Sequence, residues 1–152
     1  MSLSAIRASL KATIQTVPNV GVVNDFEPAI TRDEDLTTYF VDPALDYILG
    51  WSMTRETTGE RDASYASDFE DHLFVLRAYR AVKNADASEA ELQDLVELVR
   101  TAIRAEEGPC WNGSVQFVGH PQVRIFEARM FGTILVHYCE VTVLVTEHVT
   151  VP

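Results

Sequence analysis

Residues 123–149 read VRIFEARMFGTILVHYCEVTVLVTEHV, and this stretch decides the fold class. Two runs rich in β-branched and aromatic residues, Val123–Met130 and Thr133–Val149, are separated by Phe131-Gly132. Such residues favour strands, and a glycine between two such runs favours a tight connection. The stretch therefore predicts two long antiparallel strands joined as a hairpin, and a third short strand is expected over Val115–Val118.

The clearest predicted helix precedes this hairpin. Ser88 and Glu91 have the spacing of a capping box, and Gly108-Pro109 supplies a stop. Between them, apolar residues recur at helical spacing: Leu92, Leu95, Val96, Val99 and Ile103. This pattern predicts a long amphipathic helix that packs its apolar stripe on a sheet.

A second amphipathic helix is expected from Ser2 or Ser4 to about Thr16, with Pro18 ending it. Its apolar stripe consists of Leu3, Ile6, Leu10 and Ile14. A short strand over Val20–Phe26 should follow.

The middle of the chain is more polar. A short helix is predicted over Asp33–Phe40, with Thr31 as its cap. Alternation of apolar residues predicts strands over Leu45–Thr57 and His72–Tyr79. The polar segment between them, Thr58–Asp71, is predicted to be a long loop, and long loops in compact domains are often functional.

The predicted fold class is α+β: a mostly antiparallel sheet with a long C-terminal hairpin, packed by an N-terminal helix and one long central helix. The chain has 152 residues, of which 47% are hydrophobic. A chain of this length can bury about two thirds of its surface, so residues 1–152 are expected to form a single domain.

Charge and cysteine content narrow the function. The formal net charge of −11 argues against an independent nucleic-acid binder and against docking on anionic lipid. Cys110 and Cys139 form no CxxC pair, which favours a reducing compartment. No secretory signal and no apolar run of roughly 20 residues is evident, so we expect a cytoplasmic protein.

No motif predicts catalysis, and we expect no catalytic, metal-binding or cofactor-binding residues. His137 and Cys139 share a strand face, with Glu147 further along it, but a metal site would need at least one more convergent ligand, and core packing is the favoured interpretation. In Glu70-Asp71-His72, neighbouring strand residues point to opposite faces, so a charged loop that ends as the strand begins is favoured over acid–base chemistry. The carboxylates of residues 33–35 are interpreted as a solvated helix start rather than a cation cage.

Three further residues have simple interpretations. His120, followed by a proline, is expected in a turn before a strand. Trp51 alternates with apolar neighbours and is expected in the core. Trp111 could equally be a core residue or a surface anchor, because tryptophan is enriched at binding hot spots.

The order of the predicted elements, together with five short segments, carries a resemblance. The segments are Val20-Gly21-Val22-Val23, Gly50-Trp51-Ser52-Met53-Thr54, the run from His72 to Tyr79, Ala87-Ser88-Glu89, and the run from Gly132 to Tyr138. In this order the chain resembles the small tail-terminator or tail-completion proteins of long-tailed bacteriophages. The similarity spans most of the chain, although residues 25–46 match no pattern of that family.

The resemblance implies a structural virion protein at the head–tail junction, assembled in the host cytoplasm and without catalytic residues. Such proteins form a homo-oligomeric ring, commonly a hexamer, that caps the tail tube and offers a surface to the head connector protein. The ring's partners would be other copies of the chain, the tail tube protein and the connector, and DNA would pass through the lumen without specific binding. The candidate subunit or partner contacts are at the polar segment: Arg55, Glu60, Arg61, Asp62, Asp68 and Glu70.

Two alternatives stay open at this point. A head–tail connector or stopper ring would have similar features and would attach on the portal side. A small-ligand-binding or enzymatic α+β domain would instead use the apolar sheet as a pocket floor, and would respond to a metabolite in its melting temperature.

Overall fold

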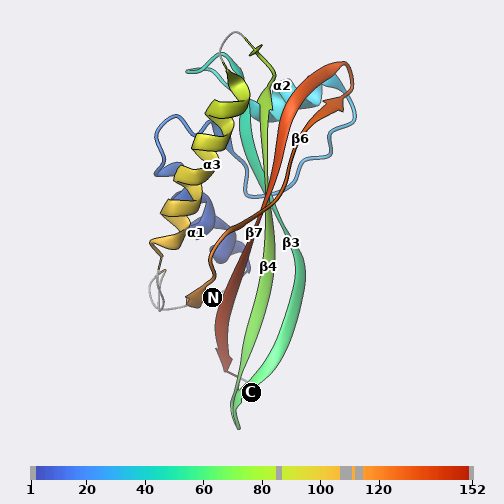
Figure 1. Cartoon of the computed structure of the whole chain (residues 1–152). Helices are drawn as coiled ribbons and strands as arrows, with labels where there is room; N and C mark the ends of the chain where they lie inside the picture. The colour runs from blue at the N-terminus through green and yellow to red at the C-terminus, as the bar shows by residue number, and fades with distance from the viewer. Residues whose placement is uncertain (1–2, 85–86, 107–110, 112–114, 151–152) are drawn as a thin grey trace.

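The computed structural model describes residues 3–84, 87–106, 111 and 115–150. It is an α+β fold whose mostly antiparallel sheet is built on three long strands, β3 (Tyr47–Ser64), β4 (Ser67–Ala81) and β7 (Ile134–Thr150). These strands lie side by side, with β4 in the centre (Figure 1). Further strands extend the two edges: β1 (Val22–Val23) and β2 (Val41–Asp42) pair with β3, and β5 (Val115–Val118) and the longer β6 (Gln122–Phe131) pair with β7.

Helices α1 (Leu3–Gln15) and α3 (Ser88–Arg104) cover one face of the sheet (Figure 1). Their apolar stripes pack with alternate residues of the long strands, so the main core lies between helices and sheet. Trp51 is fully buried in this core, and its indole N–H donates a hydrogen bond to the Val20 carbonyl oxygen at 3.1 Å. Burial of so large a side chain with its polar atom satisfied anchors the centre of β3.

Helix α2 (Asp33–Phe40) covers part of the opposite face and forms a second, smaller core. Phe40 packs directly on Gly50 of β3, where a Cβ atom would lie 2.4 Å from the Phe40 ring carbon Cδ1. Phe40 also stacks at a tilt on Tyr79, with the ring centroids 4.4 Å apart. Glycine at position 50 is therefore required for the close approach of this helix.

Several predictions are confirmed. The fold class, the N-terminal helix, the long central helix and the C-terminal hairpin are all present. Both α2 and β5 have the predicted bounds, and Ile6, Leu10 and Ile14 form the buried stripe of α1. The segment 20–26, predicted as a strand, contributes only Val22–Val23, since Gly21 has a φ of +90° and interrupts an extended conformation.

The largest correction concerns Thr58–Asp71, which is not a loop. The strands β3 and β4 continue through this segment to a tight connection between Ser64 and Ser67. Residues 55–66 are exposed, so no alternation of apolar and polar side chains marks them as a strand. Pairing of β3 with β4 holds the first half of the segment extended, and pairing of β4 with β7, ending at Ser67 opposite Thr150, holds the second half.

The predicted helix caps are also wrong. Ala87, at a φ of +50°, precedes α3, and the Ser88 hydroxyl accepts a hydrogen bond from the Lys83 backbone N–H at 2.8 Å instead of capping the helix. Arg32, rather than Thr31, precedes α2, and the Asp35 carboxylate accepts the Arg32 backbone N–H at 3.0 Å. Helix α3 ends at Arg104, and the predicted stop at positions 108–109 lies outside the described residues.

The long strands extend past the helices as a three-stranded projection, which narrows to the β3–β4 tip (Figure 1). In the described part of the chain, no helix has the length and apolar character needed to cross a bilayer.

Candidate functional site

The projection is the most distinctive feature of the fold, and we call it the arm. It consists of Thr54–Ser64 of β3, Ser67–Val75 of β4 and Thr142–Thr150 of β7. Thr54, Val75 and Thr142 lie opposite one another at its base, and the strands stay paired to the tip. The arm is therefore built of paired strands rather than a loop, with irregularities in the β3–β4 ladder at Arg55/Thr57 and Asp62/Ser64.

The predicted contact residues all lie on this arm, but on two faces. Residues opposite each other in an antiparallel ladder share a face. Arg55 lies opposite Phe74, which packs in the helix-side core, and the pairs Glu60–Glu70 and Asp62–Asp68 continue along that face.

Arg61 lies on the other face of the arm. It donates a hydrogen bond from Nε to the Asp71 carboxylate at 2.8 Å, and its guanidinium lies 4.7 Å from the centre of the Phe69 ring. The side-chain hydrogen bond from Arg61 lowers the pKa of the Asp71 carboxyl below its ordinary value. Arg61 and Asp71 therefore form an intramolecular pair on this face.

One edge of the arm is open. The strands β1 and β2 pair with β3 only between Tyr47 and Trp51. Beyond that point, among the described residues, no strand lies against the outer side of β3 as far as Ser64. Such an edge presents a row of backbone donors and acceptors that can template another strand.

The hairpin of β6 and β7 carries a second open edge. β6 pairs only with β7 in the described part of the sheet, so its outer side faces away from the sheet. Exposed apolar side chains lie on this hairpin: Val123, Met130 and Leu135, the last two opposite each other. The chain therefore has two different open strand edges, one on the arm and one on the hairpin.

The tip of the arm carries an exposed aromatic residue. Tyr65 lies in the connection between β3 and β4 and is fully exposed. The Ser64 and Ser67 hydroxyl oxygens lie 2.6 Å apart and close the turn beneath it. Exposed tyrosines contribute strongly to protein interfaces, because the ring is large and loses little conformational entropy on binding.

Near the middle of the arm, three potential metal ligands converge. Glu70 and His72 of β4 share a face with Glu147 of β7, and one ligand atom from each lies within 4.8 Å of the others. The prediction that Asp71 does not orient His72 agrees with the geometry, because Asp71 lies on the other face. From the sequence, Glu147 was placed only on the strand face of His137 and Cys139. Its place opposite Glu70 was missed, because it depends on a strand register that joins residues 77 positions apart.

A polar network covers the face of the sheet opposite α1 and α3. The Arg77 Nε donates to the Tyr138 hydroxyl at 3.0 Å, and this hydroxyl donates to the Glu140 carboxylate at 2.7 Å. Arg124 of β6 also binds Glu140. Burial opposes ionisation of Glu140, but the hydrogen bonds from Arg124 and Tyr138 outweigh it and lower the pKa of the carboxyl. The network joins β4, β6 and β7.

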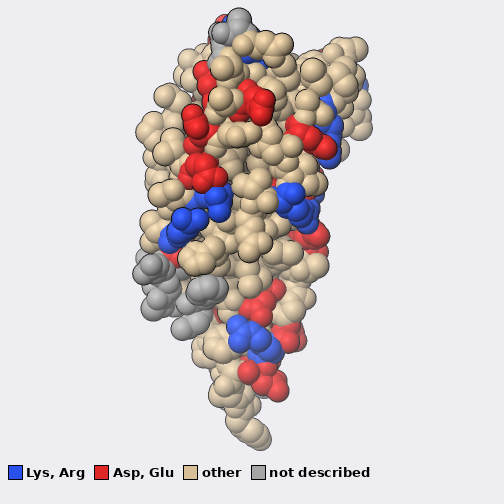
Figure 2. Space-filling model, in the orientation of Figure 1, with Lys and Arg blue, Asp and Glu red and all other residues tan. Residues whose placement is uncertain are grey.

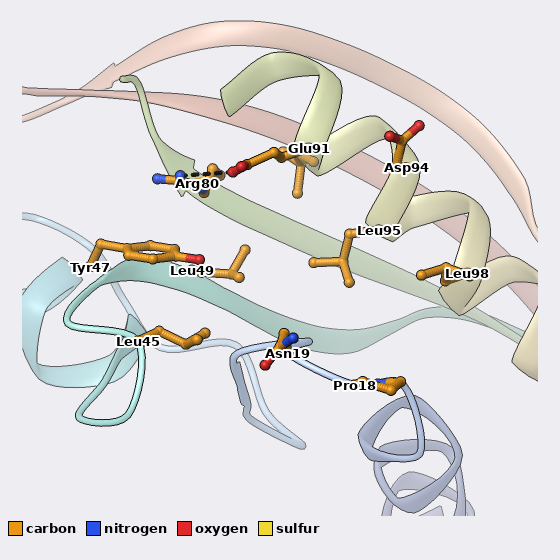
Figure 3. A pocket seen from close by; sticks show the side chains of 11 residues that line it. Pro18, Asn19, Leu45, Tyr47, Leu49, Arg80, Glu91, Asp94, Leu95 and Leu98 are labelled. Carbon is orange, nitrogen blue, oxygen red and sulfur yellow. Dashed lines mark hydrogen bonds and ion pairs between the residues drawn. The ribbon is translucent and has the colours of Figure 1, made fainter. Parts of the chain in front are cut away.

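A cleft of about 430 Å³ lies between α3, β3 and the segment after α1 (Figure 3). Its walls are mainly aliphatic: Leu45, Leu49, Leu92, Leu95 and Leu98. At one end, Arg80 pairs with Glu91 at 3.0 Å and lies over the Tyr47 ring, 4.0 Å from its centre. The polar groups at that end are thus already engaged with each other.

The remaining sequence candidates have structural roles. Cys139 is fully buried, and burial raises the pKa of its thiol to about 12. The imidazole Nε2 of His137 lies 2.8 Å from the Ser88 hydroxyl, and burial lowers the pKa of this histidine. The Asp33 and Asp35 carboxylates accept hydrogen bonds from different segments, so they do not converge on a cation.

Trp51 is in the core as predicted, whereas Trp111 is partly buried and packs against that core. His120 is exposed in the connection between β5 and β6, as predicted. Cys110 lies outside the described residues.

Comparison with known proteins adds no relative. No protein-family model matches the chain, and no curated protein sequence matches it.

Proposed function

We propose that this chain is a structural virion subunit, a tail terminator, that assembles into a homo-oligomeric ring on the end of a phage tail tube and joins the tube to the head connector. The observation that carries the proposal is the open outer edge of β3 along the arm, from Ser52 to Ser64. Between its two irregularities, at Arg55/Thr57 and Asp62/Ser64, this edge is a paired strand without proline, which is suited to pairing with a strand of another subunit. The resemblance of the element order to tail terminators supplies the biological setting.

A closed ring needs two different surfaces that fit each other, because each subunit meets its neighbours head to tail. The open edges of β3 and β6 are two such surfaces, on opposite margins of the sheet. In the proposed ring, the β3 edge of one subunit lies against the β6 edge of the next. Strand pairing would then extend the sheet from subunit to subunit, and Met130 and Leu135 would be covered.

The charge distribution supports a DNA channel that does not bind its contents. The chain carries 23 acidic and 12 basic residues. On the face shown in Figure 2, acidic side chains gather beside the upper part of α3 and along the arm, with basic side chains between them. A ring of such subunits would present net negative charge to the phosphate backbone and repel it.

Mass measurement tests this function. Untagged chain is run on size exclusion with light scattering at increasing concentrations, and the largest species is imaged by negative stain. The proposal expects closed rings whose mass is an integer multiple of 17.0 kDa. Monomers at every concentration, which also fail to bind purified tail tubes, would contradict it. A head–tail connector ring, the alternative within the same class, would bind portal particles instead of tubes.

A second candidate function is favoured by the cleft of Figure 3, whose aliphatic walls and charged end suit a small amphipathic molecule. The fluorescent probe 1-anilinonaphthalene-8-sulfonate tests this function. Binding that Leu98→Glu abolishes would favour a ligand-binding domain, since Leu98 is exposed at the cleft wall and the variant should fold. Absence of binding would leave the ring as the sole candidate.

A further inference from the structure

Three glutamates lie in a row across three neighbouring strands of the arm. Glu60 of β3 lies opposite Glu70 of β4, which in turn lies opposite Glu147 of β7. Like charges directly opposite each other destabilise a sheet. Val115 of β5 lies on the far side of Glu147, so that glutamate is enclosed between two strands and only 4% exposed. The row carries a cost that a bound cation would remove.

His72 lies beside this row on the same face and is only 3% exposed. Its Nε2 atom is 3.0 Å from Glu147 Oε1 and 3.6 Å from Glu70 Oε2. Its other ring nitrogen, Nδ1, lies 2.9 Å from the Thr58 hydroxyl. When Nδ1–H donates to Thr58, the lone pair of Nε2 points toward both carboxylates, which is how an outer contact orients a metal-ligating histidine.

We propose that Glu70, His72 and Glu147 form a binding site for a divalent transition-metal ion, with Zn²⁺ as the representative. The ligand set of one imidazole nitrogen and two carboxylate oxygens suits zinc better than Mg²⁺ or Ca²⁺, which prefer oxygen alone. The three ligand atoms lie within 4.8 Å of one another, so a single ion can reach all three after small side-chain shifts. Water, or the exposed Glu60 carboxylate, would complete a tetrahedral shell.

The placement of the ligands gives the site a structural effect. Two ligands come from β4 at positions i and i+2, and the third comes from β7 opposite the first. An ion held there would cross-link the two strands halfway along the arm and neutralise their repulsion. Asp71 and Arg61 on the other face already pair with each other and take no part.

Zinc titration by calorimetry tests the site, on untagged chain that has been stripped with a chelator and dialysed. The expected result is one high-affinity equivalent of Zn²⁺ and a higher melting temperature. Glu70→Gln and His72→Asn should each weaken binding by about tenfold or more. Asp62→Asn removes the same charge on the same face, at the next pair of that face toward the tip, and should bind zinc as the wild type does.

Glu70 is the decisive position, because its side chain is 27% exposed and its variant should fold. Zinc binding of unchanged affinity in Glu70→Gln would overturn the proposal, as would the absence of any zinc response in the wild type. A melting temperature that rises in acid and does not change with zinc would also overturn it. In that case a shared proton, and not a metal ion, would remove the repulsion between the carboxylates. Binding is measured on the single chain, so its outcome is independent of ring assembly.

Discussion

Asp33 and Thr133, one hundred positions apart, join the start of α2 to the turn of the β6–β7 hairpin. The Thr133 backbone N–H donates to Asp33 Oδ1 at 2.8 Å, and the Thr133 hydroxyl donates to the other carboxylate oxygen. Gly132 beside it has a φ of +62°, and a Cβ there would collide with Asp33 Oδ1. The Asp33 carboxylate thus holds the β6–β7 turn through two hydrogen bonds from Thr133.

This contact predicts an acid-sensitive link. The side-chain hydrogen bond from Thr133 lowers the pKa of the Asp33 carboxyl. A lowered folded-state pKa adds stability above the unfolded-state pKa, and this contribution is lost as the pH falls through the folded-state value. Asp33→Ala should therefore lower the urea midpoint at pH 7 and show a smaller loss of stability on acidification below about pH 4. An unchanged midpoint at pH 7 would contradict this role.

His137 predicts a second pH effect, in a higher range. Burial lowers the pKa of this histidine, so the folded chain resists protonation while the unfolded chain takes up a proton below about pH 6.5. Its contribution to stability is complete above that pH and declines as the pH falls toward the folded-state pKa. Urea unfolding measured between pH 8 and pH 5.5 should show that the free energy of unfolding falls less in His137→Asn than in the wild type. An equal decline in the wild type and in His137→Asn would contradict this role.

Two glycines of β3, Gly50 and Gly59, allow a matched test of how α2 packs on the sheet. Gly50→Ala places a Cβ 2.4 Å from the Phe40 ring and should destabilise the chain by about 1–3 kcal/mol. Gly59→Ala, on the open arm, meets no atom within 4 Å and should change stability by less than about 0.5 kcal/mol. Equal effects of the two substitutions, measured by urea unfolding, would show that α2 does not pack on Gly50.

Tyr65 predicts a role for the arm tip in assembly. Its side chain is fully exposed, so Tyr65→Ala should leave the melting temperature unchanged. If the tip contacts a neighbour or the tube, the variant should assemble about tenfold less tightly, as measured by light scattering. The matched control is Leu98→Ala on α3, an exposed apolar residue away from the arm. If both variants assemble equally tightly, the arm tip is not part of the interface.

The main layers of this fold could be predicted from the sequence, because periodicity reports burial. The apolar stripe of α3 faces the main core, and β7, rich in β-branched and aromatic residues, lies between the two cores; both elements were recognisable. The arm could not be predicted, since its residues 55–66 are exposed on both faces and carry no period. Residues 55–64 are extended because they pair with β4, which in turn pairs with the distant strand β7.

The candidate metal site shows the same limit. Glu70 and His72 stand two apart in the sequence, which places them on one face only if the segment is a strand. Glu147 joins them through a register that local residues do not specify. Ser88 shows that a local signal can also mislead. Its spacing to Glu91 predicts a helix cap, but in the fold its hydroxyl accepts a hydrogen bond from the Lys83 backbone N–H and contacts His137.

Amide hydrogen exchange, compared between dilute and assembled chain, tests the central claim that the open β3 edge joins subunits. The account predicts that amides in Thr54–Ser64 and in β6 become protected on assembly, while those of α3 keep the same exchange rates. Assembled particles in which the β3 edge exchanges as fast as in the monomer would contradict it.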